Sequence, residues 1–500
     1  MGARRTQATP APIPSDPDQE PVVPLNTRPG DPLAKDRGAL VWQREIRFAN
    51  QKAFERFLQK AGGKLEILDQ NEGLNAVRVR FGSVQDLESL LEGNEQTGLI
   101  FPVMPPNPRG GDVQENAVPT GKGLLRWLGV ENAESTWGKG VKIAVLDTGV
   151  APHPTFPKEV PNVVLVPSEK TPENWYGHGT AVTSLITGQL REAPGVAPGA
   201  DVTSYRISDD KGRSDTWTLA LAIRRAVDEG HQILSISMGS YGDSTLLRDA
   251  VSYALNAGAV VVASSGNEGY EKPTFPAAYG GVVKAVAVDG LGDPLLFSNQ
   301  ADPSALAAPG WSVNAAYPKD SIVEFSGTSA SAPIISGALA AVMTQASPGK
   351  TLHAYEALQL LYAYANEAGT AGPDPQTGSG SVHLGRIFER NTAHVVDAAV
   401  ASQVFHPPGE GIVPSVEINI QNQGTETLVN VPVQVNSSVQ VSQFSIPALE
   451  PGKVYTRQVP LPAPLFGAGF TLSVTTQILR ADKHPQNNQR SNTYLPAKNP

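Results

Sequence analysis

Four short apolar runs dominate the middle of this 500-residue chain, and they restrict its fold more than any other feature. Between residues 121 and 390 they alternate with segments of helical periodicity; the runs are VKIAVLD, QILSISMG, AVVVASSG and VVKAVAV. Unbroken apolar runs of this length are typical of strands buried on both faces, as in parallel sheets covered by helices. The sequence therefore predicts an α/β unit over 121–390, with a doubly wound, mostly parallel sheet and helices on both faces.

The pattern before this unit is different. Over residues 39–104, strand-like runs such as GALVWQREIRF and LNAVRVRF alternate with two helical patterns, NQKAFERFLQKAGG and SVQDLESLLEG, the second opened by Ser83. The order β-α-β-β-α-β predicts a small ferredoxin-like α+β domain. Residues 1–38 are rich in Pro, Asp and Gln and are predicted to be a disordered leader. Residues 105–120, rich in Pro and Gly, are predicted to be a linker.

The last part of the chain, 400–497, lacks helical periodicity. Its runs SVEINIQNQG, LVNVPVQVN, VYTRQVPL and FTLSVTTQIL alternate with period two and are separated by Gly, Pro and Asn. This pattern predicts an antiparallel β-sandwich of about a hundred residues.

Composition excludes several classes of function. The net charge of −9 argues against a nucleic-acid partner, which would require a basic face, and the absence of cysteine excludes disulfides, thiolate metal sites and a cysteine nucleophile. No apolar run is long enough to span a bilayer. The N-terminal segment lacks the apolar core of a signal peptide. We expect either that the protein stays inside the cell or that a signal was removed before the sequence was recorded.

Three residues with reactive side chains stand at the positions where an open α/β sheet gathers its site, near the carboxyl ends of strands and at helix starts. Asp147 ends the run VKIAVLD, His178 opens a helical segment between two glycines, and Ser329 stands where GTSASAP turns into IISGALAAVM. Each also has a simpler interpretation. Asp147 could be a turn residue before Gly149, His178 a surface or core histidine, and Ser329 an ordinary helix N-cap.

Together the three side chains form a proton relay in which Ser attacks a carbonyl, His carries the proton and Asp orients the imidazole. Such a reaction also needs donors for the tetrahedral oxyanion. Asn267, which follows the run VVVASSG, is a candidate donor together with the backbone N–H of Ser329. The alternative is that Asn267 is an ordinary turn residue.

Four motifs resemble those of subtilisin-like serine peptidases and stand in the same order: VKIAVLDTGV, which is similar to VAVLDTGV, then GHGT, ASSGN and SGTSASAP. Three further stretches add to the likeness: GVAPGADVTSYRI, SISMG and LAAPG. The resemblance covers roughly 120–390 and implies Asp147, His178 and Ser329 as catalytic triad, with Asn267 as oxyanion donor. In that family His commonly follows GHGT and Met follows the nucleophile. Here Ala181 and Ala330 stand at these positions, and we expect them to affect packing or specificity more than activity.

The resemblance also implies roles for the flanking parts. Residues 39–104 resemble the propeptide of secreted subtilases, which assists folding and inhibits the enzyme as an intramolecular partner until it is cut away, here by the enzyme itself between about 103 and 118. The C-terminal sandwich weakly resembles bacterial adhesion-type Ig-like modules. A propeptide of this kind favours export, whereas the missing signal favours the cytoplasm; we expect a secreted protein, and a monomer.

The implied substrate is a polypeptide that adds a strand between two extended segments, here Lys211 to Asp215 and Met238 to Gly242. The implied substrate-binding residues are small and uncharged apart from the one methionine, which predicts a roomy apolar pocket; they are Gly212, Ser237, Met238, Gly239, Ala263, Ser264 and Gly266. Catalysis needs no cofactor in this interpretation. Structural calcium is expected as a possibility, but no acidic run has the spacing of a calcium loop, so no ligand is assigned.

Two other hypotheses compete with this one. LDTG also resembles the active-site tripeptide of aspartic peptidases, but these need two such carboxylates, and the sequence contains no second DTG or DSG. The other is a catalytically silent binding protein that has kept the fold. Loss of activity in Ser329→Ala would distinguish that hypothesis from an active enzyme.

Overall fold

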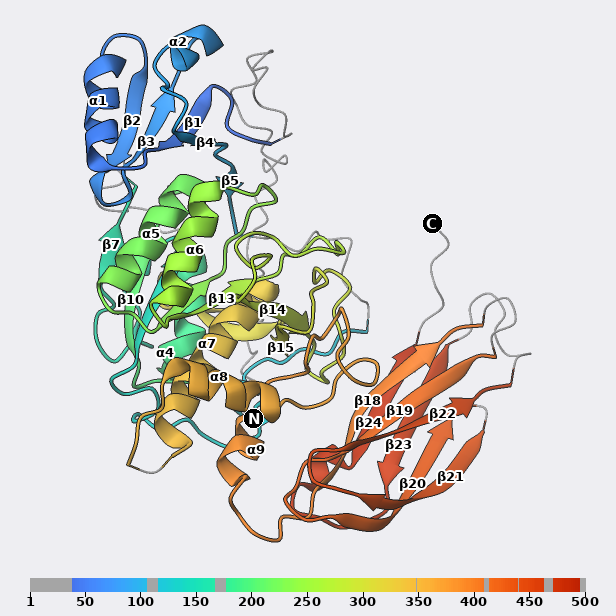
Figure 1. Cartoon of the computed structure of the whole chain (residues 1–500). Helices are drawn as coiled ribbons and strands as arrows, with labels where there is room; N and C mark the ends of the chain where they lie inside the picture. Colours follow the sequence, from blue (N-terminus) through green and yellow to red (C-terminus); the bar gives the residue numbers. More distant parts are fainter. Residues whose placement is uncertain are drawn as a thin grey trace, which may run out of the picture.

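The computed structural model describes residues 38–105, 116–166, 177–347, 349–408, 413–438, 440–462 and 471–494. Nearly all of the predicted leader, and most of the linker with the predicted processing site, lie outside the described residues. Figure 1 shows three units in chain order: a small blue unit, a central unit that runs from teal through green and yellow to light orange, and a darker orange-to-red sandwich.

The first unit is a four-stranded antiparallel sheet with two helices. Its elements follow in the order β1 (Gln43–Arg47), α1 (Gln51–Ala61), β2 (Glu66–Asn71), β3 (Ala76–Arg80), α2 (Val84–Glu88) and β4 (Gln96–Gly98). The strands lie side by side as β2-β3-β1-β4. This is the element order that the sequence predicts. Ser83 does open the second helix, because its side chain accepts a hydrogen bond from the N–H of Asp86.

A seven-stranded parallel sheet forms the centre of the second unit, as predicted. Its strand order is β15-β14-β13-β12-β6-β10-β7. The bounds of these strands are Ala305–Pro309, Val283–Val288, Val260–Ser264, Ile233–Ile236, Lys142–Asp147, Asp201–Arg206 and Asn162–Val164, in the same order. The short pairs are β5 (Pro102–Val103) with β11 (Ser214–Asp215), β8 (Gln189–Leu190) with β9 (Ala193–Pro194), and β16 (Val313–Tyr317) with β17 (Ser321–Phe325).

Helices cover both faces of the parallel sheet. On β6, Ile143 and Val145 join the core beneath α4 and α7, whereas Ala144 and Leu146 join the core beneath α5 and α6. This alternation explains why the strand is apolar from Ile143 to Leu146: each face of the sheet has its own core. The helices are α3 (Leu124–Trp127), α4 (His178–Thr187), α5 (Thr216–Asp228), α6 (Thr245–Asn256), α7 (Thr328–Gln345), α8 (Ala354–Ala363) and α9 (Leu384–Glu389).

The third unit is a sandwich of two antiparallel sheets around one apolar core. One sheet is ordered β18-β19-β22 and the other β21-β20-β23-β24. The bounds are β18 Ala398–His406, β19 Ser415–Asn422, β20 Leu428–Ser437, β21 Val441–Leu449, β22 Val454–Pro460, β23 Leu472–Ile478 and β24 Gln489–Tyr494. The predicted runs correspond to β19, β20, β22 and β23. Sequence analysis missed β18, β21 and β24, of which β24 is entirely polar apart from its last residue.

The first unit is docked onto helices α5 and α6 of the second, as Figure 1 shows, and polar contacts hold it there. The Glu45 carboxylate on β1 accepts hydrogen bonds from the N–H of Leu246 (2.9 Å) and the hydroxyl of Thr245 (2.8 Å), so it caps the start of α6. Arg78 on β3 forms an ion pair with Asp215 at 2.7 Å, beside the start of α5. The first unit thus caps the start of α6 directly through Glu45, and through Arg78 it pairs with Asp215, the residue that caps α5.

A first prediction concerns Glu45. Burial raises the pKa of its carboxyl, although the bonds to Leu246, Thr245 and Ser244 act against this effect. The stabilisation linked to the raised pKa is therefore full below the unfolded-state value near 4.5 and is lost as the pH rises through the raised value. Glu45→Gln keeps an acceptor without a charge. We expect it to be at least as stable as the parent at neutral pH and less sensitive to pH.

Thermal unfolding of the full chain between about pH 4 and pH 8 measures this effect. Glu45→Ala is the control, because it removes the acceptor at every pH and should cost about 1 kcal/mol throughout. Equal pH profiles for Glu45→Gln and the parent would show that Glu45 does not carry the pH dependence.

Candidate active site

Asp147 lies at the carboxyl end of β6 and is completely buried. Its Oδ1 atom accepts hydrogen bonds from the N–H of Thr148 (2.7 Å) and from Nδ1 of His178 (2.8 Å). Burying a carboxylate is costly unless donors surround it. A buried Asp147 needs a hydrogen-bond donor as partner, and in this structure that partner is the imidazole of His178. An aspartic peptidase would have a second carboxylate at this place.

His178 is the first residue of α4, and the backbone around it leaves no room for larger residues. A Cβ atom on Gly179 would lie 2.4 Å from the carbonyl oxygen of Gly149, and Gly177 has a φ of +89°. The ring of Phe325 packs edge-on against the imidazole, with 5.2 Å between centroids. The two glycines and Phe325 therefore fix the position of a nearly buried histidine.

Ser329 is the second residue of α7 and is also nearly inaccessible to solvent. Its hydroxyl donates to the carbonyl oxygen of Ser237 at 3.2 Å, and the hydroxyl of Ser237 donates back to the carbonyl of Ser329 at 2.9 Å. Nε2 of His178 has no hydrogen-bond partner within the described residues. The structure thus joins Asp147 to His178 directly, but no hydrogen bond joins His178 to Ser329.

Asn267 follows β13 and lies against the start of α7. Its Oδ1 atom accepts two hydrogen bonds of 2.9 Å from Thr328, one from the backbone N–H and one from the hydroxyl. A Cβ atom on Gly327 would lie 2.7 Å from Nδ2 of Asn267, and Gly327 has a φ of +115°. Sequence analysis did not use Thr328, although it stands in the quoted motif SGTSASAP. Its two donors orient the Asn267 amide beside the residue that precedes the helix.

The two segments predicted to flank a peptide substrate instead flank the chain's own residues 102–104. Pro102 and Val103 pair antiparallel with Asp215 and Ser214. On the other side, Met104 exchanges two backbone hydrogen bonds with Gly239, of 3.1 Å and 3.0 Å. The groove between these segments is therefore occupied by an extended strand of the protein itself.

The other predicted substrate-binding residues do not all lie along this groove. Gly212 lies in the turn before β11, where its N–H bonds to the carbonyl of Asp209, and it does not belong to the paired strand. Met238 is completely buried. Ala263 and Ser264 form the buried end of β13, and Gly266 follows them.

Charged and polar side chains lie beside Gly266, where the sequence predicted only small uncharged ones. A Cβ atom on Gly266 would lie 2.2 Å from the Asn299 amide nitrogen, and Asn299 donates to the hydroxyl of Tyr241 at 3.0 Å. Tyr241 in turn donates to the carboxylate of Glu268. Burial raises the pKa of the Tyr241 hydroxyl most, and the hydrogen bond to Glu268 is the second largest cause of the increase. Sequence analysis missed this cluster because its members stand far apart in the chain.

The residues that the structure describes contain no group of three or more His, Cys, Asp or Glu side chains placed to hold a metal ion. The calcium expectation remains a prediction without assigned ligands. No helix within the described ranges is long and apolar enough to cross a bilayer.

The family model of the subtilase family matches residues 138–380, which contain Asp147, His178, Asn267 and Ser329. Thermitase of Thermoactinomyces vulgaris is 34% identical over 223 residues, covering 43% of this chain and 80% of that protein. Subtilisin BL of Lederbergia lenta is 32% identical over 248 residues, covering 49% and 90%. A solved structure of the prenylagaramide maturation protease PagA is 26% identical, with a TM-score of 0.46, and covers 54% of this chain and 99% of that one.

The chain belongs to the subtilase family of serine peptidases.

Proposed function

We propose that the protein is a serine endopeptidase made as a self-processed zymogen, in which Asp147, His178 and Ser329 form the catalytic triad. The observation that carries the proposal is the buried 2.8 Å contact between Asp147 and Nδ1 of His178. It fixes the imidazole so that Nε2, which has no other partner within the described residues, is left for the proton of a nucleophile.

The reaction follows from these positions. The Ser329 hydroxyl attacks the peptide carbonyl while Nε2 of His178 takes up its proton, and Asp147 stabilises the imidazolium. The side-chain amide of Asn267 and the backbone N–H of Ser329 stabilise the oxyanion of the tetrahedral intermediate. His178 then returns the proton to the leaving amine. Water repeats the sequence on the acyl-enzyme and releases the second product.

Residues 39–104 act in this proposal as an intramolecular inhibitor. The support is that residues 102–104 fill the groove where a substrate strand would lie, paired on both sides by backbone hydrogen bonds. Because the chain is bound in the groove up to Met104 and is bound again at Asn116, whose side-chain amide donates to the carbonyl of Thr493, we place the processing bond between 105 and 116, a narrower range than 103–118. Residues 106–115 themselves lie outside the described residues.

A second prediction tests processing. The purified parent chain is expected to lose a fragment ending between 105 and 116, whereas Ser329→Ala is expected to keep the full 52.7 kDa. The measurement is intact mass over time for the two proteins side by side. Ser331→Ala is the matched control, because this hydroxyl of the same helix turn bonds to the carbonyl of Ala308 instead and should leave processing intact. If the parent and Ser329→Ala both stay whole, the zymogen proposal fails.

A third prediction tests the oxyanion role of Asn267. Asn267→Ala is expected to lower kcat by about 10²- to 10³-fold with little change in KM, because the lost donor acts only on the transition state. Steady-state kinetics of the processed enzyme on a peptide substrate measure this. Thr328→Ser, which keeps both donors to Asn267, should stay near the parent. A kcat within twofold of the parent in Asn267→Ala would exclude the role.

The remaining assignments are proposals of the same kind. The substrates are polypeptides, and the cluster of Tyr241, Glu268 and Asn299 beside Gly266 adds polar and acidic character to a pocket otherwise lined by small residues. The enzyme acts outside the cell as a monomer, and the C-terminal sandwich is an Ig-like module. The extracellular assignment is supported by one relative, the minor extracellular protease Epr of Bacillus subtilis, which is 32% identical over 249 residues covering 49% of this chain and 38% of Epr.

A further inference from the structure

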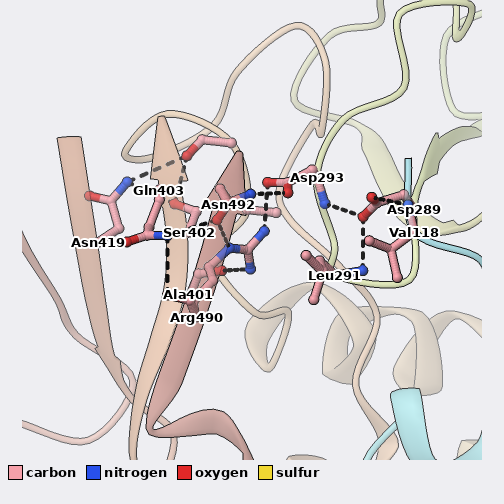
Figure 2. A network of polar contacts seen from close by, with 12 residues as sticks. Val118, Asp289, Leu291, Asp293, Ala401, Ser402, Gln403, Asn419, Arg490 and Asn492 are labelled. Atoms are coloured by element: carbon pink, nitrogen blue, oxygen red, sulfur yellow. Dashed lines mark hydrogen bonds and ion pairs between the residues drawn. The ribbon is translucent and has the colours of Figure 1, made fainter. Parts of the chain in front are cut away.

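Three segments from distant parts of the chain meet in one polar cluster, shown in Figure 2. The first is residues 116–118, directly after the linker. The second is the loop 289–293 of the central unit, after β14. The third is the pair of sandwich strands β24 and β18. None of these contacts has a role in the proposed reaction.

The Asp289 carboxylate accepts three backbone hydrogen bonds and so organises the loop 289–293. Its Oδ2 atom accepts a hydrogen bond from the N–H of Val118 (2.8 Å), while Oδ1 accepts from the N–H groups of Leu291 (2.8 Å) and Asp293 (3.0 Å). The N–H of Gly290 donates to the carbonyl of Val118 at 2.7 Å. Both backbone polar groups of Val118 are therefore held by one loop of the central unit.

The sandwich binds the same loop, 289–293, through the carboxylate of Asp293. Nη2 of Arg490 lies 2.6 Å from Oδ1 of Asp293, and the Asn492 amide donates to Oδ2 of the same carboxylate. Arg490 is nearly buried, and its second terminal nitrogen donates to the carbonyl of Ala401 at 2.9 Å. Gln403 on β18 donates to Asn492 at 2.7 Å. Arg490 and Asn492 are thus fixed within the sandwich before they reach Asp293.

One contact joins the sandwich to the segment after the linker without the loop. The side-chain amide of Asn116 donates to the backbone carbonyl of Thr493 on β24 at 2.6 Å. Residues 116–118 are therefore bound at Asn116 by the sandwich and at Val118 by the loop that the sandwich holds. A charged pair at 2.6 Å that is mostly shielded from water is a strong contact when its partners are prearranged.

We propose that the C-terminal sandwich and the loop 289–293 together clamp this chain's own segment 116–118. The clamp consists of Asp289, Gly290 and Asp293 of the loop and of Arg490 and Asn492 of the sandwich. The inference rests on the proposed self-processing for its consequence: after the linker is cut, the new N-terminal end stays bound at the clamp while residues 102–104 are free to leave the groove. Docking of the sandwich and binding of the segment then stabilise each other, because coupling between two sites is reciprocal.

Hydrogen exchange tests the clamp, in the uncut Ser329→Ala chain and in the processed protein. Arg490→Ala is expected to speed exchange at the amides of Val118 and Gly290 about tenfold, the usual weight of a hydrogen bond to a charged group. Arg457→Ala is the matched control. Arg457 lies exposed on β22 over the ring of Phe444, away from the clamp residues, so its loss should leave both amides unchanged.

Two further variants change clamp residues of the central unit instead of the sandwich. Faster exchange in these variants cannot be caused by a folding defect of the sandwich. Asp293→Asn removes the charge that Arg490 binds. Gly290→Ala places a Cβ atom 2.7 Å from the carbonyl oxygen of Pro119 and 2.9 Å from that of Val118. Both should speed exchange at Val118, while the core amides of β23 stay protected.

The outcomes separate the two proposals. If Val118 exchanges equally fast in Arg490→Ala, Arg457→Ala and the parent, the clamp is wrong whether or not the chain is cut. If the parent is never cut but Val118 responds to Arg490→Ala and to Asp293→Asn, the clamp stands and self-processing is wrong. In the processed protein, the clamp also predicts that Arg490→Ala, but not Arg457→Ala, lets an added aminopeptidase remove residues past Asn116, which intact mass measures.

Discussion

The buried carboxylate of Asp147 is the group on which the arrangement of the site depends. A carboxyl group without access to water at the end of an inner strand needs donors. The N–H of Thr148 and the imidazole of His178 supply them to its Oδ1 atom, whereas Oδ2 has no hydrogen-bond partner within the described residues. This requirement brings the start of α4 against the end of β6, so close that a side chain on Gly179 would collide with the backbone of Gly149. The small residues around His178 are thus a consequence of the buried contact.

The same constraint extends to the nucleophile. Helix α4 packs against α7, so fixing the start of one helix against β6 also fixes the other relative to the sheet. Thr328 then ties the first turn of α7 to Asn267 at the end of β13. The ends of β6 and β13 and the starts of α4 and α7 therefore converge on one site, and the positions of Asp147, Asn267 and Ser329 cannot vary independently.

Most of the central unit could be predicted from the sequence, and so could the proximity of Asp147 and His178, because both rest on local signals. Unbroken apolar runs identify strands with a core on each face, as in β6, and the GHGT and SGTSASAP motifs mark helix starts that only small residues allow. The polar strand β24 could not be found in this way, because the hydrogen bonds of Arg490 and Asn492 to a distant loop determine its residues. Likewise Glu45 could be recognised only from its contact with a helix start about two hundred residues away.

Both flanking units are docked by charged and hydrogen-bonded contacts, which give specificity more than net stability because the charges must lose water to form them. The first unit also buries Ala76, Ile100 and Val103 in the apolar core beneath α5 and α6. The covalent connection adds to these contacts, because it makes docking an intramolecular event at high effective concentration. A cut between 105 and 116 would remove that advantage from the first unit alone. The strand 102–104, bound mainly through its backbone, would then compete on equal terms with any extended peptide. The sandwich would keep its connection, and with it the clamp on residue 116 and those that follow.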